Sequence, residues 1–252
     1  MKAIVTLPAY NEARNLPRLL DRIETALDGA GLAYHVIVVD DGSTDGTGDI
    51  LTKRAERREF TVVRHPVNRG LGAALSSGLG AAARVSGPDD VVVTLDADET
   101  HPPELIPEVI RKISEGHDVV IASRFQLGAE VTGLARPRRF FSRAASVLFQ
   151  WVLPTPGMRD FTCGFRAYRS EVIRRAIAVY GQDFITEAGF ASMPEAILKL
   201  RRFGLRFAEV PMTLRYDLKK GASKMKVLRT AWFTLRLILR ERIACPAPPE
   251  QR

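Results

Sequence analysis

The chain has 252 residues, of which 46% are hydrophobic and 26% are charged. This composition is that of an ordinary globular protein and excludes a disordered or fibrous chain. The formal charge of +8 is uneven, because residues 196–252 hold 14 Lys and Arg against 4 Asp and Glu. The last quarter therefore raises the question of a phosphate-rich or membrane-surface partner.

Cellular context can be inferred from the cysteines and from the apolar runs. Cys163 and Cys245 form neither a disulfide framework nor a metal-ligand spacing, which suits a reducing cytosol. The first residues enter a short strand directly, so we expect no secretory signal. No apolar run approaches the length of about 20 residues that a membrane span needs. We therefore expect a cytoplasmic protein.

Along the chain, apolar strand runs alternate with amphipathic helix patterns. Strands are predicted at 3–7 (closed by Pro8), 36–40, 60–64, 91–95 and 118–123. Helices are predicted at 15–27, 47–58, 70–84 and 103–113. This alternation predicts an α/β fold with a mostly parallel sheet flanked by helices.

The fourth predicted strand ends in two carboxylates, Asp96 and Asp98. Its β-branched run indicates burial on both faces, and open α/β sheets bind ligands at the carboxyl ends of their strands. Two aspartates at this spacing repel each other unless a cation lies between them. A hard divalent cation completed by substrate phosphates meets that need. The alternative is a simple turn before a helix that starts at Pro102-Pro103.

Two further strands end in polar groups at the same predicted edge, PAYNE at 8–12 and DDGS at 40–43. Tyr10 offers a ring face, while Glu12, Asp40 and Asp41 offer acceptors for a base edge or ribose hydroxyls. A dinucleotide fingerprint is disfavoured, because its loose match at 78–83 lies within a predicted helix and far from the first strand.

Taken in order, the motifs resemble family 2 glycosyltransferases of the GT-A fold, in the branch of dolichyl- or polyprenyl-phosphate sugar synthases. The resemblance covers residues 3–226. It rests on PAYNE at 8–12, VVDDGSTDGT at 38–47, NRGLGAA at 68–74, LDADETHPPE at 95–104, ASR at 122–124, DFTCGFRAYR at 160–169, EVP at 209–211 and GASKMK at 221–226.

The resemblance implies a nucleotide site and a metal, Mg²⁺ or Mn²⁺, held by Asp96 and Asp98. The implied nucleotide-binding residues are Pro8, Ala9, Tyr10, Glu12, Asp40, Asp41, Arg69 and Ala97. Many relatives read D-A-D-L-Q-H, whereas Glu99-Thr100 stands here in place of Leu-Gln. We expect Thr100 to be a weaker ligand or Glu99 to contribute instead. His101 is expected to be structural, and Cys163 to be a small buried residue.

For the acceptor, the resemblance implies a phosphate site in which Arg124 is also catalytic. Its residues would be Ser123, Arg124, Arg138, Ser142 and Lys224. Relatives often carry Arg three residues before the glycine of G-x-S-K, where this chain has Leu218. Arg215, Lys219 and Lys220 are the possible substitutes.

Two segments predict contact with an anionic membrane. On a helix, Arg139, Arg143, Ser146 and Gln150 form one polar face, and aromatic and aliphatic residues fill the rest, as at a bilayer interface. The alternative is a core helix with a solvated stripe. Residues 219–240 hold seven Lys and Arg and no acid.

We divide the chain into a GT-A domain at 1–218 and a basic amphipathic helix and tail at 219–252. The GT-A domain has a nucleotide-sugar half at 1–125 and an acceptor half at 126–218.

The predicted reaction is inverting transfer of a hexose from a nucleotide diphosphate sugar to a polyprenyl or dolichyl phosphate at the inner face of the membrane. GDP-mannose is the first expectation for the donor and UDP-glucose the second. A phosphate acceptor is mostly anionic at pH 7, because its second pKa is about 6, and needs no general base. A hydroxyl acceptor would need one, for which Asp160, Glu187 and Glu195 are candidates. The missing Q-x-x-R-W signature favours the phosphate.

Three alternatives remain. They are a family 2 transferase to a lipid or glycan hydroxyl, a non-catalytic nucleotide-binding protein, and a nucleic-acid binder attracted by the basic tail. The intact pair Asp96 and Asp98 disfavours the second. The third is disfavoured because no RNA- or DNA-binding module is visible.

Overall fold

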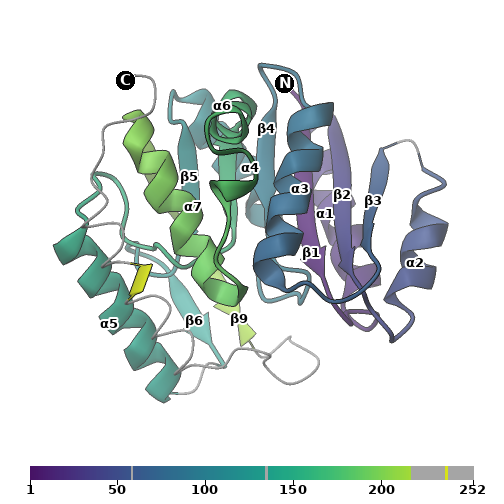
Figure 1. Ribbon diagram of the computed structural model, residues 1–252, viewed down its shortest axis with the longest axis horizontal. Coiled ribbons are helices and arrows are strands. Elements are labelled where there is room, and N and C mark those ends of the chain that lie inside the picture. The colour runs from purple at the N-terminus through teal and green to yellow at the C-terminus, as the bar shows by residue number, and fades with distance from the viewer. Residues whose placement is uncertain (58, 134–135, 217–235, 238–252) are drawn as a thin grey trace.

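A single seven-stranded sheet forms the centre of the computed structural model, which describes residues 1–57, 59–133, 136–216 and 236–237 (Figure 1). The strand order is β3-β2-β1-β4-β7-β5-β8. The strands are β1 (Ala3–Ala9), β2 (Tyr34–Asp41), β3 (Phe60–His65), β4 (Val91–Thr94), β5 (Val119–Ser123), β7 (Arg166–Arg169) and β8 (Phe207–Pro211). β7 is antiparallel to β4 and β5, and the other pairs are parallel. The predicted mostly parallel sheet is confirmed.

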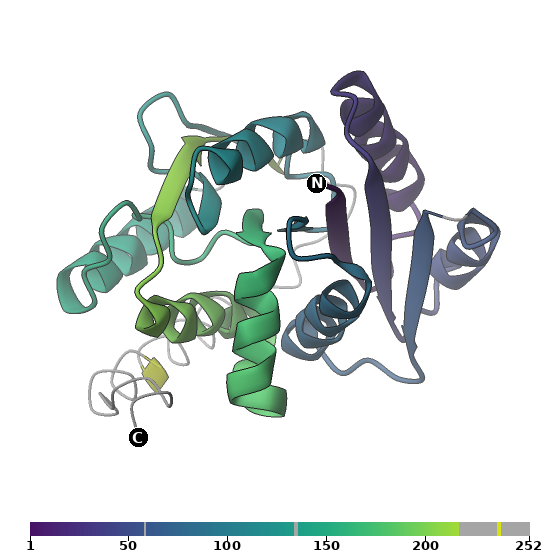
Figure 2. The same cartoon turned by 90° about the horizontal axis from the view of Figure 1, so that it is seen from above.

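Helices cover both faces of this sheet (Figures 1 and 2). On one face α3 (Leu71–Val85) contacts α6 (Ser170–Tyr180) and α7 (Ser192–Leu200), and on the other α1 (Leu16–Gly29) contacts α4 (Ile106–Ser114). The helix α2 (Thr47–Arg54) packs on β2 and β3. Short 3₁₀ turns are η1 (Pro103–Leu105), η2 (Gly181–Phe184), η3 (Gly189–Ala191) and η4 (Arg201–Phe203).

Three elements lie beyond the lower edge of the sheet in Figure 1: α5 (Arg136–Val152), β6 (Glu130–Thr132) and β9 (Thr213–Arg215). β6 and β9 pair in parallel as a small second sheet. The two predicted halves share the large sheet, because β7 and β8 come from the predicted acceptor half. The predicted C-terminal helix lies outside the described residues, apart from Arg236 and Leu237.

The predicted elements of the first half are all present, with shifted ends. β1 continues past its predicted end through Pro8 to Ala9. This is possible because β1 pairs with β4 only as far as Thr6, so the proline lies beyond that pairing. The helix predicted at 47–58 ends at Arg54, and the one predicted from residue 103 begins as a 3₁₀ turn.

Burial follows the predicted patterns. The α1 residues Leu16, Leu19, Leu20, Ile23 and Leu27 are all buried, on one face of the helix. The four residues of β4 are buried too, so this strand is covered on both faces of the sheet. Each such aliphatic side chain contributes about 1.5–3 kcal/mol. Among the described helices, none combines the length and the apolar composition required to cross a bilayer.

Gly72 allows α3 to approach the loop before α7. A Cβ added at Gly72 would lie 2.2 Å from the backbone oxygen of Glu187, whereas one at Gly80 would meet nothing nearer than an Arg84 nitrogen at 3.7 Å. Gly72→Ala should therefore lower the free energy of unfolding by about 1–3 kcal/mol through overpacking. The matched control Gly80→Ala should raise it by up to about 1 kcal/mol through helix propensity. Urea unfolding of both variants checks this, and equal effects would contradict it.

Candidate functional site

The carboxyl ends of β1, β2 and β4 lie side by side, as predicted. Ala9 at the end of β1 is opposite Asp40 of β2, and Thr94 at the end of β4 is opposite Thr6 of β1. The last residues of these strands and the loops that follow them carry the predicted nucleotide and metal residues, except Arg69, which follows β3. One edge of the sheet therefore gathers them.

Hydrogen bonds between loops join the first two strand ends. Asn11, whose φ of 54° is left-handed, donates its N–H to the Ser43 hydroxyl at 2.9 Å and accepts the Thr44 N–H at 2.7 Å. The Glu12 N–H donates to the Thr47 hydroxyl at 3.0 Å. The PAYNE and DDGS segments thus form one unit. Pro8, Ala9 and Tyr10 lead into this unit.

The two adjacent aspartates at the end of β2 have different partners. Asp40 accepts the Ser43 N–H at 3.0 Å and so closes its own turn. Asp41 is buried and accepts the N–H groups of Arg69 at 2.9 Å and Gly70 at 2.8 Å. Asp41 therefore fixes the segment that brings Arg69 to this edge.

His65, at the end of β3, completes the environment of Asp41. Its Nδ1 lies 2.6 Å from an Asp41 carboxylate oxygen, and its Nε2 lies 2.9 Å from the Ser77 hydroxyl of α3. Sequence reasoning missed His65. Its position at the end of a predicted strand of the same sheet was the signal that could have found it.

Asp96 and Asp98 are half-buried after β4, around the buried Ala97. The Asp96 N–H donates to His101 Nδ1 at 3.1 Å, and the side chain of Asp96 faces Gly164, where an added Cβ would lie 2.9 Å from its Oδ1. His101 is buried, as predicted, with its ring 5.7 Å from that of Phe165. Asp96 is thus held from both sides.

The two residues that depart from the family motif have distinct surroundings. Thr100 donates its N–H at 3.2 Å and its hydroxyl at 2.7 Å to Asp98, so it orients that carboxylate. Glu99 is buried against Arg18 and Arg22 of α1. The described residues contain no group of three or more His, Cys, Asp or Glu that could hold a metal. The pairing of its carboxylate with α1 disfavours Glu99 as a metal ligand, and the contribution of Glu99 stays a prediction.

The donor set fits a divalent cation. Two carboxylates supply hard oxygen ligands, and Mg²⁺ is commonly bound through one or two carboxylates with substrate phosphates and water as the other ligands. Asp96 and Asp98 match that arrangement. A third protein ligand is not required.

Arg124, just after β5, lies in a buried ion pair. Its guanidinium donates to both Asp160 oxygens, at 2.6 and 2.8 Å, and to the Thr162 hydroxyl at 2.6 Å. Burial opposes the charge on Arg124, but Asp160 outweighs it and the pKa is raised. Burial likewise opposes ionisation of Asp160, but Arg124 and backbone N–H groups hold the pKa of that carboxyl below its usual range. The pair is therefore ionised at neutral pH.

Glu209 on β8 holds the backbone of the segment that carries Asp160. Its carboxylate accepts the N–H groups of Arg159 and Asp160, each at 2.6 Å, and it also contacts the Ser123 hydroxyl. Burial raises the pKa of Glu209 despite these hydrogen bonds. Ser123 is fully buried, and its hydroxyl accepts the Phe125 N–H at 3.1 Å. Ser123 lies next to Arg124 in the chain, but its own hydroxyl is buried and hydrogen-bonded. Its predicted contact with the acceptor phosphate stays a prediction.

The remaining acceptor residues are placed only in part. Arg138 lies near the start of α5, and its side chain is not among the parts of the chain that the structure describes. Ser142, one turn later, is half-buried. Lys224 lies outside the described residues, as do Lys219 and Lys220, while Arg215 ends β9 with its N–H bonded to the Thr100 carbonyl at 3.1 Å.

The predicted polar face of α5 is wrong in part. Ser146 is buried and donates to the Arg159 carbonyl at 2.6 Å, on the side where Phe149 stacks on Phe161. Val147 is 63% exposed and Trp151 80% exposed. The packing of α5 against the 158–161 segment decides which face of α5 is buried. The Ser146 hydroxyl can be buried because the Arg159 carbonyl accepts its hydrogen bond.

The family is established by comparison with known proteins. The model of the family described as glycosyl transferase family 2 matches residues 4–176. The chain belongs to this family.

Two relatives are similar over most of the chain. Dolichol-phosphate mannosyltransferase of Pyrococcus furiosus is 34% identical over 227 residues, which are 90% of this chain but 60% of that protein. Undecaprenyl-phosphate mannosyltransferase of Micrococcus luteus is 33% identical over 226 residues, 89% of this chain and 88% of that protein.

A solved structure confirms the fold. Glucosyl-3-phosphoglycerate synthase from Mycobacterium tuberculosis, crystallised with Mn²⁺, uridine diphosphate and glucosyl-3-phosphoglycerate, has a TM-score of 0.67 and 21% identity. The match covers 97% of this chain and 81% of that one.

In this family 2 chain, two of the three candidate bases are committed to structural contacts. Asp160 pairs with Arg124, and Glu195 accepts from Lys199 at 2.6 Å and from the Thr186 hydroxyl at 2.7 Å. Burial opposes ionisation of Glu195, but these bonds lower its pKa. Glu187 is buried beside Gly72. Carboxyls with lowered pKa values are weak bases. The lowered pKa values of Asp160 and Glu195 therefore favour a structural role for these two residues over that of a general base.

Cys163 is buried, as predicted. Burial raises the pKa of its thiol to about 12, which leaves it protonated at neutral pH.

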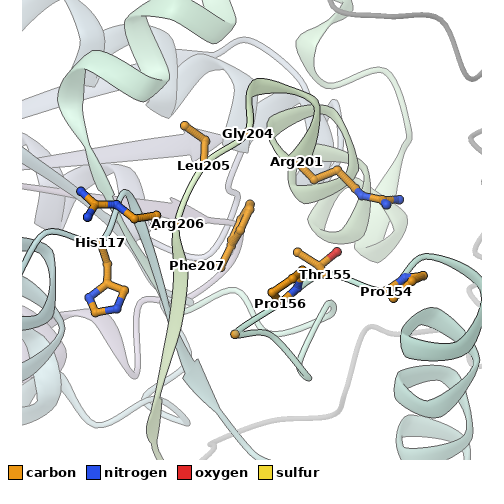
Figure 3. A pocket seen from close by; sticks show the side chains of 10 residues that line it. His117, Pro154, Thr155, Pro156, Arg201, Gly204, Leu205, Arg206 and Phe207 are labelled. Carbon is orange, nitrogen blue, oxygen red and sulfur yellow. The ribbon is translucent and has the colours of Figure 1, made fainter.

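A pocket of about 550 Å³ lies elsewhere, at the amino ends of β5 and β8 (Figure 3). This is the edge opposite to the aspartates, because β4, β5 and β8 run in the same direction. Arg201 and Arg206 lie on opposite sides of Phe207 in Figure 3, so these charges do not converge on one ligand. The candidate site of this family 2 chain is therefore the aspartate edge.

The Arg124–Asp160 pair makes a prediction for stability. Asp160→Asn should lower the free energy of unfolding by about 3–5 kcal/mol at pH 7, because Arg124 would lose its buried counter-charge. The folded pKa of Asp160 lies below the unfolded value of about 3.9, so its stabilisation is complete above that pH and is lost as the pH falls toward the folded pKa. The difference between variant and wild type in urea unfolding should shrink below about pH 4.

The control is Asp21→Asn, which removes an ion pair between Arg54 and a 64% exposed side chain. It should change the unfolding free energy by no more than about 1 kcal/mol. An Asp160→Asn protein as stable as the wild type at pH 7 would show that Asp160 does not stabilise the buried Arg124.

Proposed function

We propose that the chain transfers a hexose from a nucleotide diphosphate sugar to a polyprenyl phosphate, with inversion at the anomeric carbon. Mannose from GDP-mannose is the first donor to test and glucose from UDP-glucose the second. The observation that carries the proposal is the placement of Asp96 and Asp98 beside the joined PAYNE and DDGS loops at one sheet edge. The names of the two mannosyltransferase relatives support the lipid-phosphate acceptor.

On the donor side, the strand ends would bind the nucleotide and its diphosphate. Tyr10 and Glu12 lie in the loop that is bonded to the DDGS turn, and Asp41 holds the Arg69 segment next to it. Asp96 and Asp98 would hold Mg²⁺ or Mn²⁺, which supplies positive charge to the leaving diphosphate. Thr100 and His101 would keep the two carboxylates in place.

On the acceptor side, Arg124 would bind the lipid phosphate. Asp160 holds the guanidinium through two of its nitrogens in a single orientation, which lowers the entropic cost of aligning a phosphate against it. A phosphate nucleophile is already anionic, so no proton has to be removed. The commitment of Asp160 and Glu195 to structural bonds supports this base-free route over a hydroxyl acceptor.

The exposed stripe of α5 would rest on an anionic membrane. Arg143, Val147 and Trp151 follow one another at one-turn spacing, and all three are exposed. The helix itself lies at the lower left of Figure 1, outside the sheet. A cation followed by aliphatic and aromatic side chains suits the headgroup boundary, where a lipid phosphate is found.

The donor site is tested by thermal stabilisation. GDP or UDP at about 100 times its dissociation constant with Mn²⁺ should stabilise the wild type by about 2.7 kcal/mol. Asp98→Ala should lose most of the metal-dependent part, because one of two carboxylates is gone. The metal-free samples are the control. The nucleotide that stabilises names the base, and no shift with either one would count against an active transferase.

The same protein then tests the acceptor with radiolabelled sugar nucleotide. Product should form on polyprenyl phosphate and not on the corresponding polyprenol. Transfer to the polyprenol instead would support a hydroxyl acceptor and overturn the proposal.

Membrane contact is tested by flotation with vesicles that contain anionic lipid. Trp151→Ser should weaken binding by about thirtyfold, because about 2 kcal/mol of aromatic burial is lost and about 1.4 kcal/mol corresponds to tenfold. The control Leu127→Ser replaces a 93% exposed side chain outside α5. Equal effects of the two changes would show that α5 has no special part in binding.

A further inference from the structure

Glu99 has an unusual backbone and an unusual environment. Its φ is +60°, a left-handed value that non-glycine residues adopt rarely, and the side chain is 1% exposed. Among the described residues, neither carboxylate oxygen has a hydrogen-bond partner. Something other than hydrogen bonding must therefore stabilise both the charge and the turn.

Two arginines of α1 supply that stabilisation. Arg18 Nε lies 3.5 Å and Arg22 Nη1 lies 3.8 Å from Glu99 Oε1. The other two nitrogens of Arg22 donate to Glu104 at 2.9 and 2.8 Å, which leaves Nη1 buried and turned to Glu99. The carboxylate is thus held by two positive charges from one helix.

The same helix and the same turn carry the proposed donor site. α1 continues directly from the PAYNE loop, since the Glu12 carbonyl accepts the N–H groups of Asn15 and Leu16. Glu99 directly follows Asp98, and Thr100 donates twice to that aspartate. The ion pairs of Glu99 therefore join α1 to the turn that presents Asp98.

We propose that Glu99 is a positioning residue for the metal. Its ion pairs with Arg18 and Arg22 hold the left-handed turn and so set the affinity of Asp96 and Asp98 for a divalent cation. This inference rests on the proposed function, in which those aspartates bind Mg²⁺ or Mn²⁺.

The test measures Mn²⁺ alone, from the electron paramagnetic resonance signal of the free ion, against the full chain without nucleotide or lipid. Glu99→Gln keeps the size of the side chain and should weaken Mn²⁺ binding by about tenfold, at the lower end of the effect of groups behind metal ligands. The matched control Glu104→Gln removes the other partner of Arg22 outside the turn. It should leave the affinity within about twofold, because Glu104 is 57% exposed and supports no ligand directly.

A double-mutant cycle separates this role from general stability. Arg22→Gln should weaken Mn²⁺ binding less than Glu99→Gln, because Arg18 remains. The double variant should bind no worse than Glu99→Gln alone, since both changes break one interaction. If Glu99→Gln does not fold, Arg22→Gln against Glu104→Gln decides the matter alone.

The outcomes separate the two proposals. Equal Mn²⁺ affinity in wild type and folded Glu99→Gln, or losses that multiply in the double variant, would overturn the positioning role and leave the proposed function intact. A wild type that binds Mn²⁺ neither alone nor with nucleotide would overturn both.

Discussion

Buried carboxylates on the strands and on α7 must be satisfied by donors, and this requirement positions the loops around the site. A buried charge is tolerated only when it is paired and hydrogen-bonded, and each hydrogen bond to a charged group contributes about 1.5–3 kcal/mol. Asp41 takes two backbone N–H groups from the 69–70 segment, Glu209 takes two from 159–160, and Glu195 takes two from 186–187. Each carboxylate thereby fixes one loop over the sheet.

The aspartates after β4 differ from these. Asp96 and Asp98 are half-buried, and their neighbours orient them without enclosing them: His101 binds the backbone of Asp96, and Thr100 bonds one oxygen of Asp98. The pair is therefore suited to share a cation with a bound diphosphate. In the same turn, Glu99 pairs with Arg18 and Arg22 and so joins the turn to α1.

The acceptor side uses an ion pair in place of backbone donors. Arg124, just after β5, is held by Asp160, and the backbone N–H of Asp160 is held in turn by Glu209 of β8. α5 packs on the same segment through Phe149 and Phe161, and its other side is left exposed.

The sequence by itself determined the α/β class, the first nine helices and strands to within a few residues, and the strand ends that meet at one edge. This was possible because the burial pattern of each element is local, and the alternation of strands and helices predicts a parallel sheet. Only the tertiary structure decided how β7 enters antiparallel between β4 and β5, which face of α5 is buried, and that Glu99 turns to Arg18 and Arg22. Those outcomes depend on partners far apart in the chain. A periodic pattern shows that Ser146 and Arg143 are polar, but only packing decides that a distant carbonyl satisfies one of them inside the protein while the other remains in water.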